Sequence, residues 1–283
     1  MEFAMTNAIT QIDIPSLPKL KSGKVREVFD LGDSLLFVAT DRISAFDCIL
    51  PTGVPMKGKV LNQLSAWWFS RTSHIIPNHM ITTSWEAFPK ALNPYKDQLR
   101  GRSMIVQKAK PLPIECVVRG YLIGSGWKEY KESGLVSGMR LRSGYRMADR
   151  LDEPLLTPSR KAETGHDENI SFDQVEKMIG KELAGRLKTN SLAIYKHAFE
   201  YALKQGIIIA DTKFEFGLMN NQLILIDEAL TPDSSRFWPV SSYAPGQSPP
   251  SFDKQFVRDY LETLAWDKTP PAPALPENIL GRT

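Results

Sequence analysis

The stretch from 206 to 239 constrains this chain most strongly, because it holds apolar runs that end in charged residues. The first run, Ile207–Ala210, leads into Asp211, Lys213 and Glu215. Successive side chains of a β-strand point to opposite faces, so this acid, base and acid share one face. Threonine and phenylalanine alternate with them on the other face. The pattern predicts a strand that is charged on one side and apolar on the other.

A second apolar run, Leu223–Ile226, follows Asn220-Asn221 and ends at Asp227. Asparagine adopts a positive φ at low cost, which suits a reversal between antiparallel strands. A two-residue turn would leave Glu215 and Asp227 on opposite faces, since a one-residue slip flips every side chain. We therefore predict an odd register, with Gly217 as the candidate for a bulge, that brings the two carboxylates together. Such a pair favours Mg²⁺, and the alternative is a hairpin with solvated charges.

Composition places the chain among ordinary globular proteins. Its 283 residues allow one large or two medium domains, and 42% of them are hydrophobic. The net charge of +3 gives no argument for nucleic-acid binding. Cys48 and Cys116 are too few for a disulfide framework, and their apolar surroundings indicate buried thiols in a reducing compartment. Without a membrane-length apolar run or a signal peptide, we expect a cytoplasmic protein that binds neither nucleic acid nor membranes.

The N-terminal part predicts a β-hairpin formed by Glu27–Leu31 and Leu35–Ala39. The segment SGKVR precedes it. Gly23 lets the backbone approach a ligand closely, and Lys24 and Arg26 share a strand face. This combination can hold a phosphate, although exposed lysine and arginine are more often simply solvated.

Two further segments gather polar residues at the ends of predicted strands. The loop TDRISAFD contains Asp41 and Ser44, and is either a ligand loop or a capped turn. Arg119 ends the predicted strand Ile114–Arg119, and together with Ser125 in a glycine-rich segment it can bind an anion. A domain linker is the alternative for that segment.

A charged loop and four helices are also predicted. The loop TPSRKAETGHDEN spans 157–169, and a solvent-facing loop is its alternative reading. We predict helices over about 62–73, 182–205 and 254–266, and a shorter helix that begins at a capping box on Ser171.

Six ordered motifs together resemble the SAICAR synthetase (phosphoribosylaminoimidazole-succinocarboxamide synthase) family, in its longer, yeast-like form. They are SGKVREVFD, ATDRISAFD, ECVVRGYLIGSGW, TPSRKAETGHDENIS, ADTKFEFG and DEALTPDSSRFW, and the similarity covers about 20–266. The resemblance implies an α+β, two-lobed fold. An ATP-grasp-like or kinase-like, β-rich nucleotide-binding lobe over 1–115 would pack on a larger α/β lobe over 116–283 with the metal and substrate sites.

The resemblance implies an ATP-dependent ligase with Mg²⁺ as its metal. The enzyme would join L-aspartate to the carboxylate of CAIR, a carboxyaminoimidazole ribonucleotide, through an acyl phosphate, giving SAICAR, ADP and phosphate. The partners would be these small molecules, in a monomer or small homo-oligomer. Two alternatives are a small-molecule kinase with the same Mg-ATP site and a non-catalytic nucleotide- or RNA-binding module.

The resemblance also implies roles for individual residues. Lys213 would face the reacting phosphoryl group, and either Asp167 or Asp41 would be the general base for the amine. Glu215 and Asp227 would bind the metal. The nucleotide would contact Gly23, Lys24, Arg26, Lys108, Glu115, Val117 and Lys161, with Arg160 as an alternative to Lys161. The ribonucleotide and aspartate would contact Ser44, Arg119, Ser125, Ser235 and Arg236.

Overall fold

Two compact units make up the chain in the computed structural model, which describes residues 8–161 and 168–283. Unit 1 comprises Met1–Ser70, His79–Lys108 and Lys254–Thr283, and unit 2 comprises Arg71–Asn78 and Ala109–Asp253. This division differs from the expected boundary at 115/116, because the chain enters unit 2 after Lys108 and returns to unit 1 at Lys254. The described residues include seven α-helices and several sheets, which confirms the α+β class.

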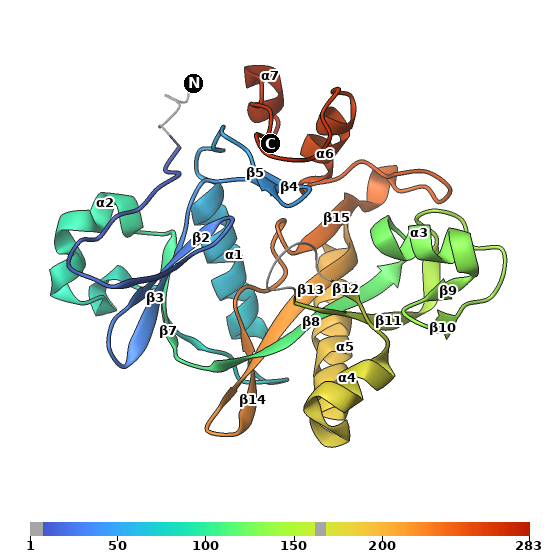
Figure 1. Cartoon of the computed structure of the whole chain (residues 1–283), viewed down its shortest axis with the longest axis horizontal. Helices are drawn as coiled ribbons and strands as arrows, with labels where there is room; N and C mark the ends of the chain where they lie inside the picture. Colours follow the sequence, from blue (N-terminus) through green and yellow to red (C-terminus); the bar gives the residue numbers. More distant parts are fainter. Residues whose placement is uncertain (1–7, 162–167) are drawn as a thin grey trace. The chain divides into compact units, whose positions relative to one another are not determined.

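Unit 1 is built on a five-stranded sheet with the strand order β1-β2-β3-β7-β6 (Figure 1). The predicted hairpin is confirmed, since Val28 pairs with Phe37 and Phe29 pairs with Leu36. The strands are β1 (Lys19–Ser22), β2 (Arg26–Asp30), β3 (Ser34–Ala39), β6 (Met80–Thr82) and β7 (Ser103–Gln107). Phe29, Leu36 and other apolar side chains of this sheet pack with Ile12 and Ile14 in a buried cluster.

The C-terminal segment belongs to unit 1 because its apolar side chains complete a second core there. Val257 and Leu261 pack with Ile43 and Leu50. The elements around this second core are β4 (Ser44–Ala45), β5 (Cys48–Ile49), α6 (Gln255–Glu262) and α7 (Glu277–Leu280). Unit 1 also contains the short helix α2 (Lys96–Leu99), which is not part of this core. The expected helix over 254–266 is therefore confirmed in its position, although it ends earlier.

Helix α1 (Lys57–Thr72) begins one turn before the predicted start at Asn62. The buried carboxylate of Asp41 accepts a hydrogen bond of 2.9 Å from the amide of Gly58, one of the first-turn N–H groups that have no partner inside a helix. The Asn62 side chain instead donates to the carbonyls of Gly101 and Ser103. The start of this helix thus depends on a residue 17 positions away.

Unit 2 is built on a six-stranded sheet with the order β12-β11-β8-β13-β14, and β15 also pairs with β13 (Figure 1). Its strands are β8 (Lys110–Tyr121), β11 (Arg150–Arg160), β12 (Glu168–Asn169), β13 (Ile207–Met219), β14 (Gln222–Ile226) and β15 (Ser235–Pro239). A separate two-stranded sheet contains β9 (Leu135–Val136) and β10 (Met139–Arg140). Residues 157–160, predicted as a loop, form the end of β11, because they pair with 114–117 of β8.

Helix α5 (Lys181–Lys204) covers one face of this sheet, close to its predicted bounds (Figure 1). Ser191 of α5 lies beside Cys116 of β8, and Phe214 pairs with Cys116 across the strands. Phe214 therefore lies on the face that α5 covers. Alternation along β13 places Asp211, Lys213 and Glu215 on the opposite face, as predicted.

Two further helices complete unit 2. Helix α4 (Phe172–Ile179) begins at the predicted capping box, in which Ser171 and Gln174 each accept a hydrogen bond from the other's backbone amide. The glycine-rich segment after Arg119 forms α3 (Gly124–Ser133) instead of an open linker. Over the described residues, none of the helices has the length and apolar character needed to cross a membrane.

Candidate active site

The register of the β13–β14 hairpin differs from the prediction. Glu215 pairs directly with Ile226, and Asn220-Asn221 forms a two-residue turn with φ values of 50° and 62°. The predicted odd register is therefore wrong, since no extra residue is inserted between the paired positions from Glu215 to Met219. The turn chemistry was correctly anticipated, and it determines the register by itself.

Asp227, which follows the last residue of β14, nevertheless acts electrostatically on Glu215. Asp227 has a φ of 68°, a left-handed conformation that aspartate adopts more readily than most residues. Burial raises the pKa of the Glu215 carboxyl, and the negative charge of Asp227 raises it further. The two carboxylates therefore interact, although strand alternation alone would separate them.

Lysine side chains are interleaved with these acids on the same face. Lys213 Nζ donates to Glu115 Oε1 at 2.5 Å, and Lys161 forms an ion pair with Glu215. Glu115 is paired with Glu215 across β8 and β13, so the backbone itself brings the two acids together. Val117, paired with Lys213, lies on this same face of β8 and is half-buried. We call Glu115, Lys161, Lys213, Glu215 and Asp227 the carboxylate–lysine cluster.

The electrostatics of the cluster keep Lys213 charged. Burial alone would lower the pKa of this ammonium group, but Glu115 and Glu215 outweigh burial and hold the pKa above its ordinary value. The positive charges of Lys161 and Lys213 in turn offset part of the increase in the pKa of Glu215. Arg160 instead pairs with the exposed Glu168 at 2.6 Å, so Lys161 is the cation of this segment that joins the cluster.

A second group of charges lies on the same sheet, two residues before Lys213. Asp211 Oδ2 accepts hydrogen bonds from Arg119 Nη1 at 3.0 Å and from Arg236 Nη1 at 2.5 Å. Arg119 Nη2 also donates to Ser125 Oγ at 2.9 Å, and its Nε donates to Thr157. Three side chains predicted to bind a phosphate, Arg119, Ser125 and Arg236, are thus brought together. We call them, with Asp211, the arginine pair site.

Glycines allow the start of α3 to approach both guanidinium groups. Gly124 has a φ of 61°, and a Cβ atom there would lie 2.6 Å from Arg236 Nη2. A Cβ atom at Gly126 would lie 3.1 Å from the Arg119 side chain. The N-terminus of α3 carries unpaired amide groups and a partial positive charge, which favour an anion. This site therefore suits a phosphate.

The side chain of Ser235 does not lie at the arginine pair site. Its hydroxyl lies 2.8 Å from that of Thr212 and is buried. Ser235 and Arg236 are neighbours on β15, so their side chains point to opposite faces. The sequence motif alone did not indicate that the side chains of Ser235 and Arg236 point to opposite faces.

The two lysines of unit 1 that were predicted to contact the nucleotide lie in ion pairs. Lys24 pairs with Asp47, and Lys108 pairs with Asp30 at 2.8 Å. The amide of Gly23 donates to the carbonyl of Arg26 at 2.7 Å, which closes a tight turn at the start of β2. Ser44 lies in β4, paired with Ile49 of β5.

The structure gives Asp41 a role in folding that the sequence did not reveal. Its carboxylate is fully buried and accepts hydrogen bonds from Arg102 Nη1 at 2.8 Å and Arg102 Nη2 at 3.0 Å. The amides of Ile9 and Gly58 also donate to it. Both oxygens of this carboxylate therefore accept hydrogen bonds inside unit 1. The other predicted base, Asp167, lies outside the described residues.

Comparison with known proteins identifies relatives over nearly the whole chain. The SAICAR synthetase family model matches residues 19–273. A phosphoribosylaminoimidazole-succinocarboxamide synthase of Geobacter metallireducens is 57% identical, with 99% of this chain and 95% of the relative covered. The enzyme of the same name from Thermodesulfovibrio yellowstonii is 53% identical, with 99% and 96% covered.

Solved structures give the same result. The SAICAR synthase of Saccharomyces cerevisiae, complexed with SAICAR, has a TM-score of 0.89 at 41% identity, covering 97% of this chain and 94% of that one. A SAICAR synthetase in complex with ADP has a TM-score of 0.65 at 27% identity, covering 84% and 89%. From the match of the family model and these full-length similarities, the chain belongs to the SAICAR synthetase family.

Proposed function

We propose that this protein joins L-aspartate to the carboxylate of CAIR, with ATP as the energy source, to give SAICAR, ADP and phosphate in purine biosynthesis. The observation that carries this proposal is the 57% identity to a phosphoribosylaminoimidazole-succinocarboxamide synthase over 99% of the chain. Related structures hold SAICAR in one case and ADP in another. We further propose a cytoplasmic enzyme that acts as a monomer or small homo-oligomer.

The chemistry requires an activated carboxylate, since an amine does not displace a carboxylate oxygen. Transfer of the γ-phosphoryl group of ATP to CAIR would give an acyl phosphate that the aspartate amine can attack. Such a transfer depends on positioning and on neutralising the charge of the phosphoryl oxygens. Lys213, charged and held at 2.5 Å from Glu115, is suited to that neutralisation.

The residues of the carboxylate–lysine cluster also fit a magnesium ion. Mg²⁺ binds through one or two carboxylates and completes its coordination with water and phosphate oxygens. Burial and, after it, the negative charge of Asp227 raise the pKa of Glu215, and a divalent cation would relieve the repulsion between the two carboxylates. Among the described residues there is no group of three or more histidine, cysteine or acidic side chains that could hold a metal. Water and phosphate oxygens of ATP, whose charge the metal would neutralise, would complete the coordination.

Substrate assignments follow the two groups of charges. The arginine pair site would hold the phosphate of CAIR, and Ser44 would contact the imidazole or aspartate. ATP would contact Gly23, Lys24, Arg26, Lys108, Glu115, Val117 and Lys161. The two-lobed, kinase-like organisation and Asp167 as the general base remain parts of the proposal.

An ADP-release assay tests the proposal against its main alternative. Purified protein is supplied with MgATP and CAIR, with and without aspartate, and ADP is measured by a coupled enzyme assay. We expect sustained ADP release only with aspartate. Full ADP release without aspartate would identify a small-molecule kinase, and a complete lack of turnover would favour a binding module.

Asp227→Asn is expected to reduce kcat by about a hundredfold or more, because metal ligands contribute several kcal/mol to stabilising transferred charge. Asp227 follows the last residue of β14 and is half-buried. The protein should therefore remain folded, and Mn²⁺ binding, measured by electron paramagnetic resonance, should weaken. Unchanged Mn²⁺ binding, or a collapsed thermal melting curve, would contradict this assignment.

Arg236→Lys is expected to raise the KM for CAIR by about ten- to a hundredfold, because a point charge replaces a fork of hydrogen-bond donors. Arg236 binds Asp211 with only one of its terminal nitrogens, Nη1. The KM values for ATP and aspartate, measured in the same assay, serve as internal controls. An unaltered KM for CAIR would count against a phosphate at the arginine pair site.

A further inference from the structure

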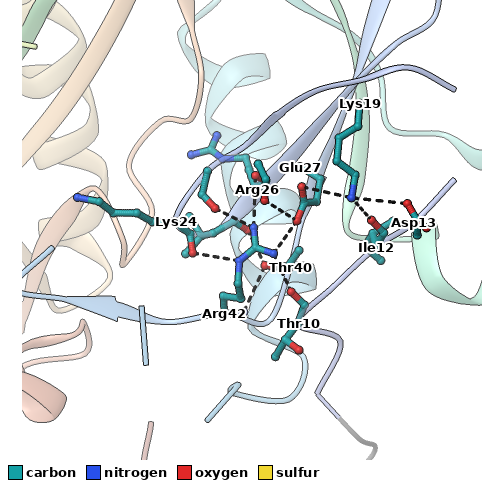
Figure 2. Close-up of polar contacts among 12 residues, drawn as sticks. Thr10, Ile12, Asp13, Lys19, Lys24, Arg26, Glu27, Thr40 and Arg42 are labelled. Carbon is teal, nitrogen blue, oxygen red and sulfur yellow. Dashed lines mark hydrogen bonds and ion pairs between the residues drawn. The ribbon is translucent and has the colours of Figure 1, made fainter. Parts of the chain in front are cut away.

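Arg42 binds the turn at Gly23 and Lys24 through its guanidinium group (Figure 2). Arg42 Nη2 donates to the carbonyl of Gly23 at 2.8 Å, and Nε donates to the carbonyl of Lys24 at 3.2 Å. A longer contact of 3.5 Å joins Nη2 to the carbonyl of Arg26. One side chain therefore contacts three carbonyl groups within four residues of the chain.

The remaining carbonyl of the turn, that of Val25, accepts hydrogen bonds from Thr40, two residues before Arg42. The Thr40 amide donates to it at 2.9 Å and the Thr40 hydroxyl donates at 2.8 Å. The carbonyl groups of residues 23–26 are thus all held from the side of Thr40 and Arg42. This arrangement fixes the orientation of each peptide plane in the turn.

That orientation determines where the amide groups point. In a trans peptide the N–H of one residue is antiparallel to the carbonyl of the residue before it. The carbonyls of Gly23 and Lys24 point toward Arg42, so the amides of Lys24 and Val25 point away from it. Successive amides directed to one side form a concavity that binds anions. Figure 2 shows the Lys24 side chain extending away from Arg42.

Arg42 is itself held by partners on its other side. Its Nη1 donates to Glu27 Oε1 at 2.6 Å and to the carbonyl of Thr10 at 2.7 Å. The side chains of Arg42 and Glu27 are 12% and 2% exposed, so this ion pair is shielded from solvent. With its nitrogens committed to these contacts, Arg42 acts on a ligand through the turn and does not touch the ligand itself.

We propose that Arg42 is a positioning residue for the nucleotide phosphates. It holds the turn at 23–26 with its carbonyls inward and its amides outward, where they bind phosphate oxygens together with Lys24. This inference rests on the proposed function, since it requires ATP as a substrate. A lysine cannot replace Arg42, because it lacks the planar fork that reaches several carbonyls at once.

The test compares Arg42→Lys with the wild type in steady-state kinetics and in ADP binding by calorimetry. We expect the KM for ATP and the Kd for ADP to rise about tenfold, equivalent to about 1.4 kcal/mol. The KM for aspartate should change less than about twofold, as the turn does not bind it. Arg142→Lys is the matched control, because Arg142 pairs with Asp152 at 3.0 Å on an exposed surface of unit 2.

A second variant, Glu27→Gln, keeps the shape of the partner and removes its charge. Glu27→Gln should raise the KM for ATP less than Arg42→Lys does. If Arg42→Lys does not fold, the KM of Glu27→Gln for ATP tests whether Arg42 positions the turn. An unchanged KM for ATP in folded variants, or an equal rise in the KM for all substrates, would overturn the proposed role of Arg42. The proposed function of the enzyme would not be affected by either result. A wild type without ATP-dependent turnover would overturn the proposed function and, with it, this inference.

Discussion

Lys213→Met is expected to reduce kcat by about a hundred- to a thousandfold, with little change in the KM for CAIR. Removing one preorganised donor to a developing charge typically costs that much. Glu115 and Glu215 outweigh the effect of burial and raise the pKa of Lys213, so this side chain is charged on the polar face of β13. Methionine has a similar length without the charge, so the loss reports on the ammonium group. Single-turnover measurement of ADP formation gives the effect on the phosphoryl transfer directly.

Lys188→Met is a suitable control for this variant. Lys188 is an exposed lysine of α5 whose ammonium group lies 4.9 Å from the centre of the Phe172 ring. Its replacement should leave kcat unchanged. A Lys213→Met enzyme with near-normal kcat would remove Lys213 from the proposed chemistry, whereas a large loss in both variants would indicate general damage to unit 2.

Arg102→Met is expected to lower the free energy of unfolding by about 3–5 kcal/mol, because it leaves a buried carboxylate without its counter-charge. The side chains of Arg102 and Asp41 are 2% and 0% exposed. Arg102 also donates to the carbonyl of Ala39, and Asp41 holds the first turn of α1 through Gly58. The loss should therefore destabilise unit 1 as a whole. Urea unfolding followed by circular dichroism measures the change.

Arg142→Met provides the comparison, since the Arg142–Asp152 pair is exposed and such pairs contribute little to stability. A separate variant, Asp41→Asn, distinguishes folding from catalysis. If Asp41 supports the fold, the melting temperature of Asp41→Asn falls and the turnover of the remaining folded protein is largely retained. A normal melting temperature with lost turnover would restore Asp41 as the general base.

Features with a local cause could be predicted from the sequence. The charged face of β13 follows from the alternation of side chains along a strand, and α5 follows from its apolar period. The capping box at Ser171 depends on residues only three positions apart. In each case the residues that determine the structure are neighbours in the chain.

Features that depend on distant partners could not be predicted. Residues 157–160 look like a polar loop, but they become a strand by pairing with β8, about forty residues earlier in the chain. The interaction of Asp227 with Glu215 was expected from a register shift, whereas the strands pair in the register of a two-residue turn and Asp227 has a positive φ. The ion pair of Asp41 with Arg102 joins residues 61 positions apart. Tertiary pairing, which no local pattern encodes, decides the strand at 157–160 and the ion pair of Asp41 with Arg102.

The most direct test follows the nitrogen of aspartate into the product. Wild-type protein is incubated with MgATP, CAIR and ¹⁵N-labelled aspartate, and the product is analysed by mass spectrometry while ADP is counted. The account predicts one labelled SAICAR for each ADP released. Release of ADP together with a phosphorylated product that carries no label would contradict it.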